Sequence, residues 1–352
     1  MQKKEGLLSL GYLSLALALT FVGSFGIGSV PPFLAAISPS EGIWRRKIQG
    51  EKYQRIPSPF LRKSAQAYYD KSGVVHVFAQ TDHDLYWIQG FITARDRLWQ
   101  MDFQSRVADG RLAELLGKKA LGLDEYFVSV GMRQAISLAD ENLQTDPTTQ
   151  MPVSAFVSGV NSYVESLEER DYPLEYILTG TKPKKWSSRD IASLLKLMSF
   201  RLAGHSDDLV MTRYLQKFGD KILQDLFPYQ HDLEVPFARV GGGRQSDPSA
   251  RVLSEPFIAR LQGFPSFLKP RPGNGSNNWA LSGKKTKLGF SLLANDTHLS
   301  YSLPSIWYEM QLNSPHQSVY GATIPGAPGI ILGYNNQIAW ATTNASTDVM
   351  DW

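Results

Sequence analysis

Residues 273–279 read Gly-Asn-Gly-Ser-Asn-Asn-Trp and lead into the apolar run Trp279-Ala280-Leu281. Ser276 thus follows a glycine in a tight polar turn and precedes a strand-like segment. Cleavage of the Gly275–Ser276 bond gives Ser276 a hydroxyl nucleophile and a free α-amine. Because an α-amine titrates at about 7.7–8.0, part of it is unprotonated near neutral pH and can activate the hydroxyl. The stretch therefore predicts an N-terminal nucleophile that needs no histidine–aspartate pair.

The composition indicates a large globular protein. Its 352 residues are 43% hydrophobic, enough for a core larger than that of one small domain. The formal net charge of +3 is too small to indicate a nucleic-acid partner. Cysteine is absent, which excludes disulfides, thiolate metal sites and cysteine nucleophiles.

The N-terminus has the features of an export segment. Lys3 and Lys4 precede residues 6–40, which contain no charged residue. The apolar stretch is long enough to span a bilayer at about 20 residues, and no clear small-x-small cleavage site follows. We predict a signal anchor or signal peptide at residues 1–40, with an uncleaved anchor favoured. The protein is then exported and is membrane-anchored, periplasmic or extracellular.

Changes in periodicity divide the rest of the chain. A polar linker at residues 41–65 is followed by a mainly helical region at 66–240, which opens with a hairpin signal around Gly73 and a capping box at 81–84. Glycines and prolines mark residues 241–275 as a linker or removable spacer. Strand patterns then fill residues 276–352, so we predict an α+β fold. The open strand region that ends at Trp352 leads us to expect an incomplete second part.

Several motifs in this order resemble the penicillin acylase (penicillin amidase) family, from about residue 67 to the end. They occupy residues 73–77, 89–91, 94–101, 110–117, 275–280, 293–299, 303–309 and 339–344. The resemblance implies an N-terminal-nucleophile hydrolase with an αββα sandwich, incomplete in this chain. Its precursors cleave themselves, lose a spacer and form an α/β heterodimer. The substrates it implies are small-molecule amides, such as a β-lactam antibiotic with an acyl side chain or an N-acyl-homoserine lactone.

The same resemblance implies roles for the residues at the junction. Cleavage falls between Gly275 and Ser276, and Ser276 forms the acyl-enzyme. The backbone N–H of Asn344 matches one oxyanion-hole donor, and the backbone carbonyl at His298 matches the group that orients the seryl amine. Branches of the family that act on cephalosporins and acyl-homoserine lactones also carry histidine there and use its side chain as a relay.

A calcium ion and an acyl pocket are also implied by the resemblance. One structural calcium ion would be held by Asp348, Asp351, the backbone carbonyl of Met350, and Asp208, which stands where the family has a glutamate. Oxygen donors of this kind suit a hard cation. The acyl-pocket positions are occupied by aliphatic side chains, which are Met198, Leu202, Leu299 and Leu332.

One departure from the family pattern leaves alternatives open. The family's second oxyanion donor, an asparagine, and a nearby arginine lie further downstream than residue 352, so we expect a fragment or a truncated gene product. Such a chain is alternatively a non-catalytic, membrane-anchored remnant. A serine β-lactamase-like enzyme is a further alternative, because Ser282-Gly283-Lys284-Lys285 fits the S-x-x-K motif. No K-T-G motif follows later in the chain, however, and Gly283 disfavours the helix that this chemistry needs.

Elsewhere in the chain, we expect Asp96 and Arg97 to form a structural ion pair.

Overall fold

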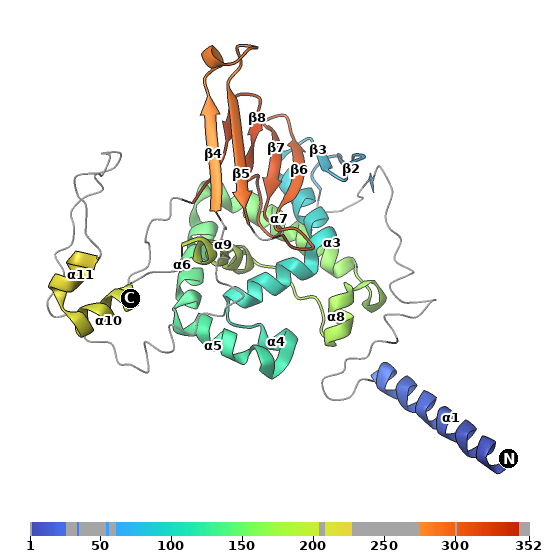
Figure 1. Ribbon diagram of the computed structural model, residues 1–352. Coiled ribbons are helices and arrows are strands. Elements are labelled where there is room, and N and C mark those ends of the chain that lie inside the picture. The colour runs from blue at the N-terminus through green and yellow to red at the C-terminus, as the bar shows by residue number, and fades with distance from the viewer. Residues whose placement is uncertain are drawn as a thin grey trace. The chain divides into compact units, whose positions relative to one another are not determined.

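The computed structural model describes residues 2–25, 34, 54–55, 61–203, 208–226, 275–299 and 301–344 (Figure 1). The chain divides into two compact units. The first combines Met1–Met198 with Arg271–Thr343, and the second combines Ser199–Pro270 with Asn344–Trp352. Helices and sheet both contribute to the first unit, so the predicted α+β class is confirmed. The predicted spacer at 241–275 lies outside the described residues, apart from Gly275.

The N-terminal helix α1 spans Gln2–Phe25. Among the described residues, no helix is both long enough and apolar enough to cross a membrane. The export segment at residues 1–40 stays a prediction.

A seven-stranded sheet forms the centre of the first unit, in the order β1-β2-β3-β6-β7-β8-β9. Its only parallel pair among the described strands is β3 with β6. This pair joins the part of the chain before Ser276 to the part after it. The strand bounds are β1 Gln54–Arg55, β2 Ala65–Tyr69, β3 Val75–Ala79, β6 Tyr308–Asn313, β7 Ser318–Thr323, β8 Leu332–Asn335 and β9 Ala339–Trp340.

The predicted hairpin around Gly73 is present as β2 and β3. The carboxylate of Asp70 accepts hydrogen bonds from the backbone N–H groups of Ser72, at 2.8 Å, and Val74, at 3.0 Å. Gly73 has φ of 80°, a conformation that glycine adopts without the steric cost other residues incur. The turn residues therefore fix the register that brings Val75 and Val77 into the core.

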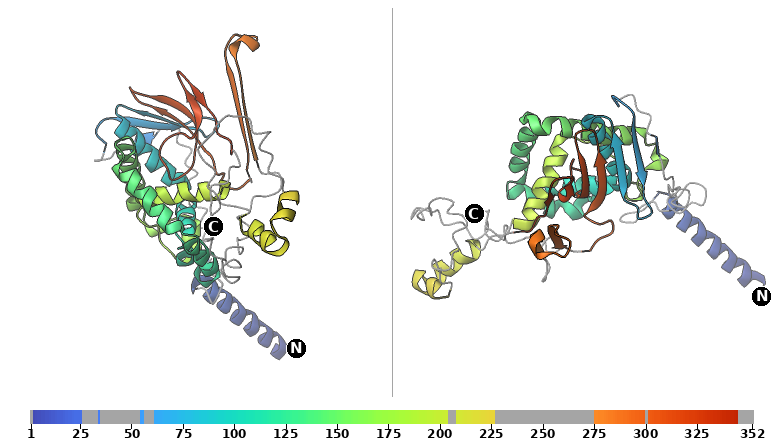
Figure 2. Two further views of the ribbon diagram at one scale, coloured as in Figure 1. Left: turned by 90° about the vertical axis from the view of Figure 1, so that its left-hand side faces the viewer. Right: turned by 90° about the horizontal axis from the view of Figure 1, so that it is seen from above.

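Helix α3, Asp82–Ala108, begins at the predicted capping box. Thr81 is the N-cap, and its hydroxyl accepts the backbone N–H of Asp84 at 3.1 Å. The helix lies against one face of the sheet together with α7, Pro147–Ser166 (Figures 1 and 2). Trp87 is fully buried in this core, as expected of a core aromatic. Burial of such large apolar side chains is the main favourable contribution to folding.

Glycines allow α3 and α7 to cross at close range. A Cβ built on Gly90 would lie 2.1 Å from the carbonyl oxygen of Phe156, and one built on Gly159 would lie 1.9 Å from that of Trp87. Real Cβ atoms do not approach backbone oxygens so closely. The two helix backbones therefore touch at a point where a side chain of any size would separate them.

Shorter helices complete the helical layer of the first unit and the described part of the second. The sequence pattern predicted a mainly helical region here, and the described residues are mainly helical, as expected. They are α4 Ala113–Leu116, α5 Leu121–Ser129, α6 Met132–Thr145, α8 Leu174–Thr179, α9 Ser188–Ala203, α10 Asp208–Phe218 and α11 Asp220–Leu226.

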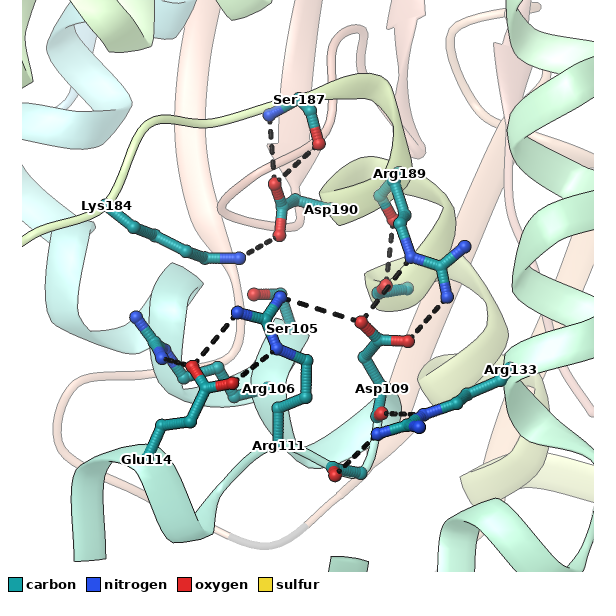
Figure 3. Close-up of polar contacts among 12 residues, drawn as sticks. Ser105, Arg106, Asp109, Arg111, Glu114, Arg133, Lys184, Ser187, Arg189 and Asp190 are labelled. Atoms are coloured by element: carbon teal, nitrogen blue, oxygen red, sulfur yellow. Dashed lines mark hydrogen bonds and ion pairs between the residues drawn. The ribbon is translucent and has the colours of Figure 1, made fainter.

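A network of ion pairs joins the C-terminal end of α3 to the helices around it (Figure 3). The carboxylate of Asp109 accepts a 2.6 Å hydrogen bond from Arg189 of α9, while its carbonyl oxygen accepts one of 2.8 Å from Arg133 of α6. Arg106, which is buried, bonds the carboxylate of Asp102 at 2.7 Å and also contacts Glu114 of α4. Because buried charges are costly unless paired, these contacts fix the relative positions of four helices.

A second polar cluster links α3 to the sheet. The carboxylate of Asp96 accepts hydrogen bonds from the hydroxyls of Tyr69 on β2 and Tyr308 on β6. The ion-pair partner of Asp96 is Arg95, with Nε at 3.2 Å from Oδ1, so the predicted pairing with Arg97 is wrong. The guanidinium of Arg97 lies instead over the ring of Tyr308, 5.3 Å from its centroid, where a cation–π contact stabilises it.

Candidate active site

The predicted cleavage junction lies in a two-stranded antiparallel ribbon that is separate from the main sheet. Strand β4 spans Gly275–Leu281 and pairs with β5, Leu292–His298. Gly275 is opposite His298, and Ser276 is opposite Thr297. The turn predicted around Ser276 is wrong for the residues from Gly275 onward, because backbone pairing with β5 holds them extended.

Residues 342–343 are anchored beside the start of β4. The hydroxyl of Thr343 donates a 3.0 Å hydrogen bond to the carbonyl oxygen of Ser276. The side-chain amide of Asn295 donates to the carbonyl oxygen of Thr342 at 2.9 Å and accepts the N–H of the same residue at 3.1 Å. Its nitrogen also lies 3.3 Å from the carbonyl oxygen of Asn277. One asparagine thus ties the end of the β9 region to the strand that begins at the junction.

Sequence reasoning missed both Asn295 and Thr343 as members of this site. Asn295 lies within one of the quoted motifs, but nothing in its local pattern identifies the distant backbone groups it bonds. An asparagine on a strand is unusual enough to draw notice, because strands are depleted in asparagine.

The side chains of Ser276 and His298 lie on opposite faces of the ribbon. Successive side chains of a strand alternate between faces, and directly opposed residues share one, so Ser276 shares its face with Thr297. His298 shares the face of Gly275, and a Cβ built on Gly275 would lie 3.9 Å from Nδ1 of its ring. Nε2 of the same ring lies 3.0 Å from Oδ2 of Asp296. The relay role for His298 in amide hydrolysis stays a prediction.

Two predicted site residues meet in the second unit. The side-chain amide of Asn344, the predicted oxyanion residue, donates a 2.6 Å hydrogen bond to the carbonyl oxygen of Leu202 in α9. The three other predicted pocket residues belong to the first unit and lie on separate elements. Met198 is on α9, Leu299 follows β5, and Leu332 begins β8; each is half-buried.

The calcium site is largely outside the described residues. Asp348, Met350 and Asp351 all lie there, while Asp208 begins α10. Within the described part of the chain, no group of three or more His, Cys, Asp or Glu side chains is arranged to hold a metal ion. The calcium ion stays a prediction.

The alternative nucleophile Ser282 does not begin an α-helix. It is followed by a 3₁₀ turn of three residues, Gly283–Lys285, and its hydroxyl accepts the N–H of Lys284 at 3.4 Å. The S-x-x-K chemistry needs the lysine one helical turn after the serine on the same helix face. The geometry therefore opposes the β-lactamase-like reading.

Comparison with known proteins identifies the family. A family model described as Penicillin amidase matches residues 64–352. Because this match covers most of the chain, the chain belongs to the penicillin amidase family.

Individual relatives are acylases. Acyl-homoserine lactone acylase QuiP from Pseudomonas aeruginosa is 32% identical over 275 residues, which are 77% of this chain and 32% of the relative. Penicillin acylase 2 proenzyme from Pseudomonas sp. strain SE83 is 28% identical over 309 residues, covering 83% of this chain and 38% of the relative. The chain spans about a third of the length of the curated relatives it matches.

Among solved structures, a thermostable penicillin G acylase from Alcaligenes faecalis, in a tetragonal form, matches with a TM-score of 0.41 and 21% sequence identity. That match covers 52% of this chain and 98% of the other.

Proposed function

We propose that the protein is an amidohydrolase that removes an acyl group from a small-molecule amide, with Ser276 as its nucleophile after cleavage of the Gly275–Ser276 bond. The observation that carries the proposal is the hydrogen bond from Thr343 to the carbonyl oxygen of Ser276. It ties the segment that continues into Asn344 to the start of β4. Membership of the penicillin amidase family supports the same assignment.

By this proposal, the new α-amine of Ser276 takes the proton of its own hydroxyl as Oγ bonds to the substrate carbonyl carbon. The negative charge that develops on the carbonyl oxygen is stabilised by the backbone N–H of Asn344, a type of interaction whose loss costs about 2.7–4 kcal/mol in transition-state free energy. When the intermediate collapses, the carbon–nitrogen bond breaks, the α-ammonium gives its proton to the leaving amine, and an acyl-enzyme remains on Oγ. Water then releases the acid, with the same α-amine acting as base.

The proposed substrates are an N-acyl-homoserine lactone or a β-lactam antibiotic with an acyl side chain. Relatives named acyl-homoserine lactone acylase and penicillin acylase support these two classes. Aliphatic side chains at Met198, Leu299 and Leu332 favour an alkyl over an aromatic acyl group, because apolar pockets select mainly by shape and size.

We further propose that the protein is exported and that calcium stabilises the processed form through Asp208, Asp348, Met350 and Asp351. Their oxygen donors suit calcium, which would hold the two parts of the chain together and take no part in the chemistry. The lysines before the long uncharged N-terminal stretch support export.

The test uses the full-length protein expressed from its gene, beside the Ser276→Ala variant. N-terminal sequencing of the mature protein is expected to yield Ser-Asn-Asn-Trp, and release of fatty acids from acyl-homoserine lactones, or of side-chain acids from penicillins, is expected to depend on Ser276. A processed Ser276→Ala protein that retains activity would refute the assignment. A protein that stays uncleaved and hydrolyses neither class favours the non-catalytic alternative.

A further inference from the structure

The hydroxyl groups of Ser276 and Thr297 belong to residues that are opposed across the β4–β5 ribbon. The two residues form a directly opposed pair in the register, and both are half-buried. Opposed residues of antiparallel strands share one face, with Cβ atoms about 4.5–5.5 Å apart, and serine and threonine hydroxyls at such positions can hydrogen-bond to each other. Thr297 is therefore the residue of β5 best placed to contact Oγ, the atom that reacts under the proposed function.

The indole of Trp307 fixes how the Thr297 hydroxyl bonds. Nε1 of Trp307 donates a 3.1 Å hydrogen bond to Oγ1 of Thr297. Because an indole N–H only donates, Oγ1 is the acceptor in this contact and keeps its own hydrogen for a second partner. Trp307 immediately precedes β6 of the main sheet, whose first residue, Tyr308, is buried. The main sheet thus anchors the group that orients the Thr297 hydroxyl.

The backbone of Ser276 is held from a second direction. The hydroxyl of Thr343 donates a 3.0 Å hydrogen bond to the carbonyl oxygen of Ser276, while pairing with β5 holds the strand. With the backbone fixed, rotation about χ1 among three staggered positions is the freedom left to Oγ. All of these residues follow the Gly275–Ser276 bond in the sequence, so their contacts with one another do not require that bond to be intact.

We propose that Thr297 is a catalytic residue whose hydroxyl, oriented by Trp307, donates a hydrogen bond to Oγ of Ser276 in the processed protein. This inference rests on the proposed function and adds one group to it. When Oγ accepts from Thr297, it stays in one χ1 position and its own hydrogen points away from Thr297, where the α-amine can take it. Trp307 is a positioning residue, because it acts through Thr297.

The hydrogen bond from Thr297 strengthens as Oγ gains negative charge. In acylation, the α-amine takes the hydroxyl proton while Oγ bonds to the substrate carbonyl carbon, and a hydrogen bond to a charged oxygen is stronger than one to a neutral oxygen. In hydrolysis of the acyl-enzyme, the α-amine takes a proton from water as the water oxygen bonds to the acyl carbon. The carbon–Oγ bond then breaks, and the α-ammonium returns the proton to Oγ. Thr297 stabilises the departing oxygen and keeps its own proton throughout.

The experiment compares processed Thr297→Val with the processed wild-type protein, using an acyl-homoserine lactone and a penicillin as substrates. We expect kcat to fall by about 10- to 100-fold with KM unchanged, the factor that a hydrogen bond to a charged atom supplies when it is made in the transition state. Labelling of Ser276 by phenylmethanesulfonyl fluoride, followed by mass spectrometry, is expected to slow by a similar factor, because this reagent reacts with the same Oγ. Trp307→Phe, which removes only the orienting N–H donor, is expected to lower kcat by about 3- to 10-fold.

Two controls accompany these variants. Thr297→Ser keeps the hydroxyl and is expected to retain most of the wild-type kcat. Thr145→Val makes the same hydroxyl-to-methyl change at an exposed position at the end of α6 and is expected to match wild type. A Thr297→Val protein with wild-type kcat and labelling rate would overturn the inference alone. A Thr297→Ser protein as slow as Thr297→Val would also overturn it, because the hydroxyl would then not be the group that matters.

Processing supplies a second measurement if Thr297→Val remains uncleaved. Oγ of Ser276 is also the nucleophile of the cleavage under the proposed function, so the rate of cleavage of the full-length protein then replaces kcat. Cleavage of Thr297→Ser beside a folded but uncleaved Thr297→Val supports the inference, and a stall in both variants overturns it. A wild-type protein that is neither cleaved at Gly275–Ser276 nor active overturns the proposed function as well.

Discussion

Val77 of β3 pairs in parallel with Leu312 of β6, and the predicted cleavage junction lies between these residues in the sequence. Both side chains are buried in the core that also contains Met310. The segments before and after Ser276 therefore share one sheet and one core. Covalent continuity at the junction is not what holds them together.

After cleavage at Gly275–Ser276 under the proposed function, the two parts are accordingly expected to stay associated. They should co-elute from a sizing column in native buffer and separate only in denaturant. Leu312→Ala is expected to lower the free energy of unfolding by about 2–5 kcal/mol, because it leaves a cavity under β3. Urea denaturation measures this loss, with Leu138→Ala on the exposed surface of α6 as the control. Separation of the wild-type parts in native buffer contradicts the shared-core argument.

The close crossing of α3 and α7 predicts opposite effects for two glycine substitutions. Gly159→Ala is expected to destabilise the protein by about 3 kcal/mol, since its Cβ would meet the carbonyl oxygen of Trp87 and push the helices apart. Gly122→Ala in α5 meets no atom within 4 Å and is expected to stabilise by about 0.5–1 kcal/mol through helix propensity. Thermal melts of the two variants measure these effects. Equal changes in melting temperature would count against a tight crossing of α3 and α7.

The polar cluster around Asp96 joins the two parts of the chain as well. Tyr308→Phe removes a buried hydroxyl that donates a hydrogen bond to the carboxylate of Asp96. This substitution is expected to lower the free energy of unfolding by about 1–3 kcal/mol. Tyr320→Phe, whose hydroxyl bonds the exposed Glu309, is the matched control and is expected to cost less. The urea concentrations at the unfolding midpoints of both variants test this prediction. It fails if Tyr320→Phe lowers the midpoint more than Tyr308→Phe does.

Stability is expected to fall at alkaline pH. Burial raises the pKa of Tyr126 to about 12, whereas a tyrosine in the unfolded chain titrates near 10. The folded state thus keeps this proton to higher pH than the unfolded state does. The contribution of the Tyr126 hydroxyl to the free energy of unfolding is complete below pH 10 and is lost as the pH rises from 10 towards 12.

Melting temperatures measured from pH 8 to pH 12 test the alkaline effect. Tyr126→Phe is expected to lose less stability than wild type over that range, because the titrating hydroxyl is gone. Tyr301→Phe alters a fully exposed side chain and is expected to follow the wild-type curve. A Tyr126→Phe curve that runs parallel to wild type would remove the basis of this prediction.

Local patterns predicted the elements whose signals lie in adjacent residues. The hairpin at Gly73, the cap at Thr81 and strands within residues 276–352, such as Ser318–Thr323, follow from turn chemistry, capping and periodicity. The extended state of Ser276 did not follow, because pairing with Thr297 overrides the turn preference of a glycine- and asparagine-rich segment. The partner of Asp96 and the role of Asn295 also depend on contacts distant in sequence, which no local pattern contains.

Asn295 offers the sharpest test of how the candidate site is held together. Its amide nitrogen donates to the carbonyl oxygen of Thr342, and its oxygen accepts the N–H of the same residue. Asn295→Asp keeps the shape and one acceptor but sets a carboxylate oxygen against a carbonyl oxygen. The free energy of unfolding is expected to fall by about 1–3 kcal/mol. If the segment leading to Asn344 shifts, kcat/KM for acyl hydrolysis is expected to fall by about tenfold or more.

The measurement compares kcat/KM of purified, processed protein with its melting temperature. Asn336→Asp, an exposed residue in the turn between β8 and β9, is the control and is expected to match wild type in both. Because Asn295 acts through the backbone of residues 342–343, its replacement should reduce activity by more than the change in folding stability accounts for at the assay temperature. An Asn295→Asp enzyme that melts earlier but hydrolyses amides at the wild-type rate would limit this residue to a structural role.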